Sequence, residues 1–299
     1  MHQKLLALAI ALSFAACTQA TTPEPTRAPA EKPEVAQAAA AVHALPALAS
    51  TQFDKIPWKP SNPKAPQGVM VHVISGDPKT GPFNAIVKAP AGLKIPLHTH
   101  AAEFHGVTLT GGMVHAAQTG VAQPLAKGST WVQPGNEPHV DECHSETDCV
   151  FLVFFEGPLD TVFVDTPAVD PKMVVTPAAD VKWVAVRPEM EKSPMMAVIS
   201  GNPKEGAFSA LFQFPAGMTT SVHTHTAEFS GSVISGVHNR GVSPDQLLKL
   251  ENGSVWSEKS GAPHMEKCGT EADCVIAVQM DGALDHEDVK LTVGDQAAK

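Results

Sequence analysis

Short apolar or alternating runs separated by Pro- and Gly-containing turns dominate the chain after about residue 58. Two such runs open each half, with a Gly-Asp-Pro or Gly-Asn-Pro turn between them and a Pro-Ala-Gly break after the second. No segment between them keeps a 3.6-residue apolar period, so the pattern predicts an all-β fold, a sandwich or a barrel. The predicted strands include residues 70–75, 83–89, 107–110, 130–133, 150–155, 195–200 and 208–214.

The chain repeats itself with an offset of 125 residues. From Trp58 to Asp160 the second copy aligns on the first without a gap, and roughly a third of the paired positions are identical. A unit of this length is a domain and not a solenoid repeat. A polar residue kept in both copies, while its surroundings differ, indicates one physical requirement that operates twice.

The N-terminus indicates export. Lys4 precedes an apolar stretch, residues 5–14, that is too short to span a bilayer and leads into Ser-Phe-Ala-Ala-Cys17. This ending resembles a bacterial lipobox, which implies that Cys17 is lipidated and that the protein is a periplasm-facing cell-envelope lipoprotein, at the outer membrane. The alternative is an ordinary secretory signal cleaved nearby. We expect a signal peptide, an Ala/Pro-rich flexible tether, two domains and a tail, at residues 1–17, 18–52, 53–168, 169–293 and 294–299.

The net charge of −10, with no Lys/Arg cluster, disfavours nucleic acid as a partner. Nothing indicates membrane contact beyond the lipid anchor, and a homodimer stays open.

Four further cysteines form two matched pairs, each with five intervening residues. In an exported protein this spacing indicates one local disulfide per domain. A metal-binding or redox thiol pair is the alternative. The expected disulfides are Cys143–Cys149 and Cys268–Cys274.

Of the 14 histidines, only three per repeat occupy matched positions. Two of the three form a His-x-His pair, whose imidazoles share one face of a strand and need only a remote third ligand to chelate an ion. A glutamate follows three residues later in both copies. These donors suit one divalent transition metal per barrel, whether Fe, Mn, Zn, Ni or Cu, whereas the alternative is histidines that only hydrogen-bond within the barrel. The candidate ligands are His98, His100, Glu103 and His139, and then His223, His225, Glu228 and His264.

The spacing around these residues resembles the two cupin motifs. Gly92-x5-His98-x-His100 with Glu103 is similar to the first, and Gly128-x5-Pro134-x4-His139 is similar to the second. The second copy repeats both motifs, so the chain resembles a two-domain cupin, most closely a group of double cupins of unknown function. The resemblance covers nearly everything after the tether. It implies two tandem jelly-roll barrels, related by internal duplication, each with a metal inside its mouth.

The sequence also departs from the cupin pattern. The cupin glutamate usually falls four or five residues after the second histidine, whereas Glu103 falls three after it, so His105 is the alternative fourth ligand. In the second motif Lys259 replaces proline. Repeat one has three further histidines near its site where repeat two has none, which leads to the hypothesis that barrel one performs the chemistry; neutral drift is the alternative. The matched positions of the two repeats are His72 and Ala197, His105 and Ser230, and His115 and Arg240.

The leading functional hypothesis is a metal-dependent enzyme, dioxygenase-like or isomerase/lyase-like, that acts on a small organic molecule. Glu103 would be a fourth ligand or a proton shuttle. The alternative is a non-catalytic protein that binds or senses a ligand or a metal, as the zinc-binding cupin of certain anti-sigma factors does. A duplicated scaffold without metal is a third hypothesis.

Overall fold

The computed structural model describes residues 48–61, 68–120 and 122–290. The expected signal peptide, Cys17, most of the tether and the C-terminal tail lie outside these residues. The described part is built from β-strands and three short 3-10 helices, and none of its helices is long and apolar enough to cross a membrane. The all-β prediction is confirmed. The helices are η1 (Phe53–Lys55), η2 (Ala178–Asp180) and η3 (Pro244–Gln246).

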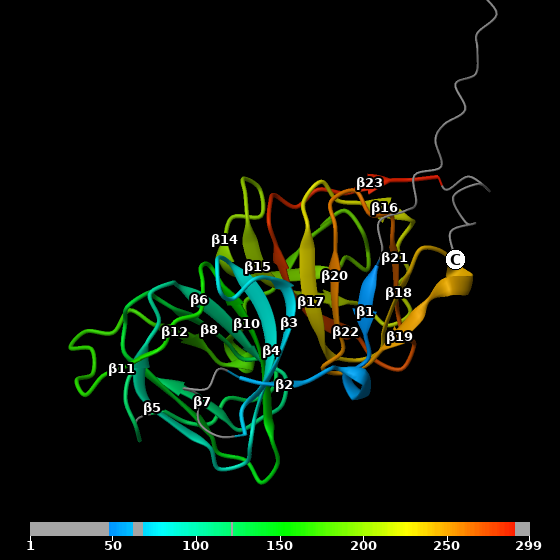
Figure 1. Cartoon of the computed structure of the whole chain (residues 1–299). Helices are drawn as coiled ribbons and strands as arrows, with labels where there is room; N and C mark the ends of the chain where they lie inside the picture. Colours follow the sequence, from blue (N-terminus) through cyan, green and yellow to red (C-terminus); the bar gives the residue numbers. More distant parts are fainter. Residues whose placement is uncertain (1–47, 62–67, 121, 291–299) are drawn as a thin grey trace, which may run out of the picture. The chain divides into compact units, whose positions relative to one another are not determined.

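The first barrel combines a seven-stranded and a four-stranded antiparallel sheet (Figure 1). The larger sheet has the order β12 (Val174–Thr176), β8 (Thr130–Gln133), β6 (Phe104–Thr108), β10 (Cys149–Phe155), β4 (Phe83–Ala89), β3 (Met70–Gly76) and β2 (Lys59–Pro60). The smaller sheet has the order β11 (Val162–Phe163), β5 (Lys94–Thr99), β9 (His139–Cys143) and β7 (Met113–Ala116).

The second barrel repeats this architecture at the same offset. Its seven-stranded sheet has the order β1 (Ala49–Thr51), β20 (Val255–Glu258), β17 (Phe229–Ser235), β22 (Cys274–Met280), β15 (Phe208–Phe214), β14 (Met195–Gly201) and β13 (Val184–Ala185). The strands that match the smaller sheet form two groups: β19 (Leu248–Leu250), β18 (His238–Gly241) and β21 (Met265–Cys268), and then β16 (His223–Thr224) and β23 (Glu287–Asp288).

The two repeats exchange their first strands. β1 precedes repeat one but pairs with β20 of barrel two, and its counterpart β12 precedes repeat two but pairs with β8 of barrel one. Ala49–Thr51 falls within the segment expected as the tether, and Val174–Thr176 within the segment expected as the second domain. Each seven-stranded sheet therefore contains one short strand that precedes the other repeat in the sequence.

The fully apolar strand β10 is buried on both of its faces. Side chains alternate along a strand, so Phe151, Val153 and Phe155 pack inside barrel one. Leu152 and its neighbours on the other face join a second core, which also contains Leu211 and Ala277 of barrel two. The shared core explains why this strand has no polar position.

A glycine and a tryptophan on neighbouring strands pack face to face in each barrel. Gly106 is the cross-strand partner of Trp131, and a Cβ on Gly106 would lie 1.9 Å from the indole ring. Gly231 and Trp256 repeat the arrangement. Both tryptophans are buried. The indole ring of Trp131 stacks on His115, and that of Trp256 contacts Arg240.

Both predicted disulfides are present, Cys143–Cys149 and Cys268–Cys274, each with a Cα–Cα distance of 5.7 Å. The first joins the end of β9 to the start of β10. It therefore fixes the strand that begins with His139.

Candidate metal centre

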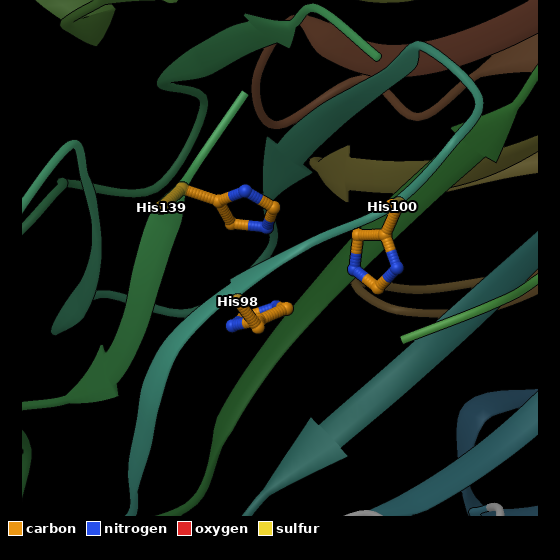
Figure 2. Close-up of side chains that lie close together, drawn as sticks. All are labelled: His98, His100 and His139. Atoms are coloured by element: carbon orange, nitrogen blue, oxygen red, sulfur yellow. The ribbon is translucent and has the colours of Figure 1, made fainter. Parts of the chain in front are cut away.

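Three imidazoles converge in barrel one (Figure 2). His98 lies in β5, His100 follows that strand, and His139 opens β9, where it is the cross-strand partner of His98. The ring centroid of His98 lies 4.2 Å from that of His139 and 5.0 Å from that of His100. Ligand atoms of all three lie within 4.8 Å of one another. The structure thus brings the three predicted histidines close enough to share one ion.

Backbone carbonyls orient all three rings. A carbonyl oxygen only accepts a hydrogen bond, so each Nδ1 carries the hydrogen and each Nε2 keeps its lone pair. The acceptors are the carbonyl oxygens of Pro96 for His98 (2.8 Å), Asp160 for His100, and Glu137 for His139 (3.1 Å).

Burial favours the neutral form of two of these rings. It lowers the pKa of His139 from 6.5 to about 2, although the nearby Asp141 carboxylate acts in the opposite direction. Burial also lowers the pKa of His100, which the Asp160 carbonyl partly offsets. Neutral imidazole is the form that binds a metal ion.

The second triad repeats this geometry. The ring centroid of His223 lies 4.2 Å from that of His264 and 5.0 Å from that of His225. Each Nδ1 again faces a backbone carbonyl, of Ser221 (3.0 Å), Ala262 (3.3 Å) and Asp285 (2.5 Å) respectively. Burial lowers the pKa of His223 to about 4 and that of His264 to about 2.

One ring nitrogen in each triad is buried without a hydrogen-bond partner in the described part of the chain. These atoms are Nε2 of His139 and Nε2 of His264. Leaving such an acceptor unsatisfied costs about 1–3 kcal/mol, which coordination of an ion would offset. The residues present therefore fit a divalent transition metal.

The glutamates predicted as fourth ligands lie elsewhere. Oε1 of Glu103 lies 3.1 Å from Nε2 of His105, and Oε1 of Glu156 lies 3.7 Å from the same nitrogen. Glu228 pairs with Lys259 at 2.8 Å. Glu103 and Glu228 also do not appear among the described residues that line the two barrel cavities. In this geometry neither glutamate is grouped with the histidine triad of its barrel.

His105, the alternative fourth ligand, belongs to the contact between the barrels. Its Nδ1 is hydrogen-bonded to the Ser209 hydroxyl at 3.1 Å. The matched pair on the other side is Asn84 and Ser230, at 2.7 Å. His105 is thus directed away from the three histidines of barrel one.

Sequence reasoning missed Asp141, a carboxylate two residues after the third histidine of barrel one. Oδ2 of Asp141 lies 3.6 Å from Nε2 of His98 and 3.9 Å from Nε2 of His139. Glu266 occupies the matched position. The signal was present, since both copies carry an acid at this position and residues i and i+2 of a strand share a face.

A hydrogen-bonded network positions Asp141. His115 is its cross-strand partner on β7, and Nδ1 of His115 donates to Oδ1 of Asp141 at 2.8 Å. Nε2 of His115 faces Oε1 of Gln133 at 3.0 Å, and the Gln133 amide nitrogen donates to the Glu137 carbonyl. The ring stacks on Trp131 with a centroid distance of 5.0 Å.

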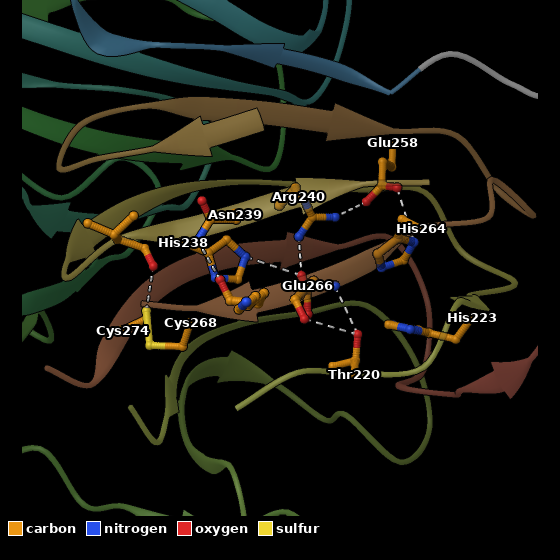
Figure 3. A network of polar contacts seen from close by, with 12 residues as sticks. Thr220, His223, His238, Asn239, Arg240, Glu258, His264, Glu266, Cys268 and Cys274 are labelled. Atoms are coloured by element: carbon orange, nitrogen blue, oxygen red, sulfur yellow. Dashed lines mark hydrogen bonds and ion pairs between the residues drawn. A yellow bond between two sulfur atoms is a disulfide. The ribbon is translucent and has the colours of Figure 1, made fainter. Parts of the chain in front are cut away.

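Barrel two builds the same network around an arginine (Figure 3). Arg240 is the cross-strand partner of Glu266, and its two terminal nitrogens donate to Glu266 and to Glu258. The guanidinium lies 4.7 Å from the centroid of the Trp256 ring. His238 approaches Glu266 from another side, at 3.4 Å.

The carboxylates of this network titrate differently. Burial raises the pKa of Glu258 to about 7, although Arg240 opposes this change. Burial also acts to raise the pKa of Glu266, but Arg240 and His238 outweigh it and hold that pKa well below its usual range. In barrel one, burial of Asp141 is likewise outweighed by His115, and the net pKa is lowered.

Each triad faces a largely apolar cavity. In barrel one the cavity measures about 750 Å³ and is lined by His98, His100 and Asp141 together with Phe83, Phe104, Phe155 and Phe163. In barrel two it measures about 440 Å³ and is lined by His223, His225 and Glu266 together with Phe212, Phe214, Phe229 and Met280. These volumes suit a small organic molecule.

A duplicated antiparallel barrel with a buried histidine triad in each half defines a double-barrel protein with two candidate metal sites. Family comparisons agree with this description. The ChrR Cupin-like domain matches residues 47–160, and a domain of unknown function (DUF4437) matches residues 165–287. The chain belongs to the cupin superfamily, and its two barrels make it a bicupin. A comparison with curated proteins found no match.

Solved structures share the fold at low sequence identity. A candidate dioxygenase from Nostoc punctiforme has a TM-score of 0.66 at 11% identity, over 82% of this chain and 87% of that one. The oxalate decarboxylase of Lactobacillus farciminis has a TM-score of 0.53 at 12% identity, over 83% and 90%. The gentisate complex of a salicylate 1,2-dioxygenase variant from Pseudoaminobacter salicylatoxidans has a TM-score of 0.54 at 12% identity, over 79% and 82%.

Proposed function

We propose that the protein is a metal-dependent enzyme of the cell envelope that acts on a small organic molecule, with dioxygenase-like or isomerase/lyase-like chemistry. One divalent transition metal would be held in each barrel, by His98, His100 and His139 and by His223, His225 and His264. The observation that carries the proposal is the convergence of three carbonyl-oriented imidazoles at an apolar cavity.

The chain's own residues would bind and position the substrate. A divalent metal at this site would supply Lewis-acid polarisation of a substrate oxygen, and iron would add redox chemistry with dioxygen. Phe104 and Phe155 are stacked with centroids 4.6 Å apart in the cavity wall, next to His100. These rings would hold an apolar substrate body against the histidines and exclude water.

Export is also part of the proposal. The two disulfides support an oxidising compartment. The lipobox-like ending at Cys17 supports a lipid anchor facing the periplasm, most simply at the outer membrane.

A non-catalytic role in binding a ligand or a metal is the second candidate, and one observation favours it for barrel two. There Arg240 donates to both carboxylates beside the triad, and the cavity is the smaller of the two. In this version barrel one performs the chemistry and barrel two binds without reacting.

Metal analysis of the purified protein tests the proposal. We expect one metal ion per barrel, and loss of one ion in His139→Ala and of the other in His264→Ala. His144→Ala is the matched control, because His144 follows β9 but is 41% exposed and contacts Glu142. Less than one metal ion per chain in the wild-type protein would refute the proposal. Spectra in air and under nitrogen then identify the chemistry, since oxygen-sensitive iron supports a dioxygenase and zinc supports hydrolysis or sensing.

A further inference from the structure

The two triads differ in the carboxylate beside them. In barrel one, Oδ1 of Asp141 is held by His115, and Oδ2 faces the Nε2 atoms of His98 and His139 at 3.6 and 3.9 Å. The side chain of Asp141 is 14% exposed and lines the cavity. One oxygen is therefore fixed by the protein, while the other lies next to the imidazole lone pairs.

In barrel two the matched carboxylate is held by an arginine. Glu266 accepts a hydrogen bond from Arg240 and lies 3.4 Å from Nε2 of His238. In barrel one, Met113 occupies the position that matches His238. Arg240 cannot lose its charge and binds carboxylates strongly, so Glu266 is neutralised before any ion arrives.

We propose that Asp141 is the fourth protein ligand of the metal in barrel one, whereas Arg240 withholds Glu266 from the metal in barrel two. The two sites of this chain therefore differ in charge and in number of ligands, three imidazoles with a carboxylate against three imidazoles alone. The inference rests on the proposed metal sites. It places the carboxylate on the strand of the third histidine, β9, and not after the His-x-His pair.

The experiment isolates each site. His225→Ala leaves site one intact, and His100→Ala leaves site two intact. Each parent, freed of metal with a chelator, is titrated with Co²⁺ by calorimetry, and its visible absorption spectrum is recorded. Cobalt suits the test because its d–d bands report coordination number. Binding by both parents tests the proposed function, and the variants below test the assignment of Asp141.

In the His225→Ala parent, Asp141→Asn should weaken Co²⁺ binding about 10- to 100-fold and change the d–d bands. Asp141→Glu, which keeps a carboxylate, should recover part of the affinity. As a control for folding, the metal-free variant should unfold thermally at the same temperature as the metal-free parent. An affinity within threefold of the parent, or weaker binding with an unchanged spectrum, would overturn the assignment of Asp141 as a ligand.

The reverse experiment transplants the network of barrel one into barrel two. Arg240→His, Glu258→Gln and Glu266→Asp together, in the His100→Ala parent, should raise the Co²⁺ affinity about tenfold or more and shift the spectrum toward that of site one. Because the expected result is a gain of Co²⁺ affinity, this variant remains informative if Asp141→Asn fails to fold. Unchanged affinity in a folded transplant would overturn the role given to Arg240.

Discussion

The metal-free protein should lose stability steeply as the pH falls below 6.5, and the third histidine of each triad should cause much of this loss. Burial holds the pKa of His139 and of His264 at about 2 in the folded protein. The unfolded chain returns both to about 6.5 and so binds more protons below that pH. Folding stability is therefore fully present above pH 6.5 and falls as the pH drops through the window from 6.5 toward 2.

The magnitude follows from the two pKa values. At pH 5.5 the protonation of one such histidine in the unfolded chain costs about 1.4 kcal/mol of folding free energy, so both together cost about 3 kcal/mol. Replacing His139 and His264 by glutamine removes these two titrations, and the amide can still donate to the backbone carbonyl that orients each ring. The double variant should therefore lose about 3 kcal/mol less than the wild type between pH 7.5 and pH 5.5.

Urea denaturation at several pH values between 7.5 and 5.0, with a chelator present, measures this difference by linear extrapolation. His144→Gln, at a partly exposed position outside the triads, is measured in parallel as the matched substitution. If the double variant and the wild type lose the same free energy over this range, the two imidazoles are not held neutral by burial, and the account of the triads as ready metal ligands fails.

Three further predictions concern the framework around the sites. Leu152→Ala, in the core shared by both barrels, should cost about 2–5 kcal/mol and leave one cooperative calorimetric transition; two separated transitions would contradict a shared core. Gly106→Ala forces a methyl group against Trp131 and should cost about 1–3 kcal/mol, with a changed near-ultraviolet circular dichroism spectrum as the check. Replacing Cys143 and Cys149 by serine should cost about 2 kcal/mol in urea denaturation; an unchanged midpoint would contradict this value.

Local patterns in the sequence were sufficient to predict the strands and to find the histidines of the two triads. A His-x-His pair on a strand must place both rings on one face, and the duplication identified the third histidine. The position of Glu103 could not be obtained in this way. The chain bends at Ala101 and Ala102 before β6 begins at Phe104, so counting along a regular strand from His100 fails.

Nonlocal pairing explains the remaining errors. Asp141 could be recognised beside the triad only once the register of β9 against β5 and β7 was known. The exchange of β1 and β12 was equally hidden, because each is a three-residue strand whose partner lies in the other repeat. Neither the composition nor the period of so short a segment specifies its partner.

The side-chain networks beside the two triads have diverged as units. His115 and Arg240 each contact two side chains, the carboxylate on the neighbouring strand and the side chain at the matched position on β8 or β20. With the smaller imidazole, an aspartate and a neutral amide complete the network, and the carboxylate keeps one oxygen directed at the triad. With arginine, two glutamates surround the guanidinium. A single substitution from one set to the other would leave a buried donor or charge without its partner, which is strongly destabilising. The difference between the barrels therefore follows from three coupled positions, and the histidines themselves are unchanged.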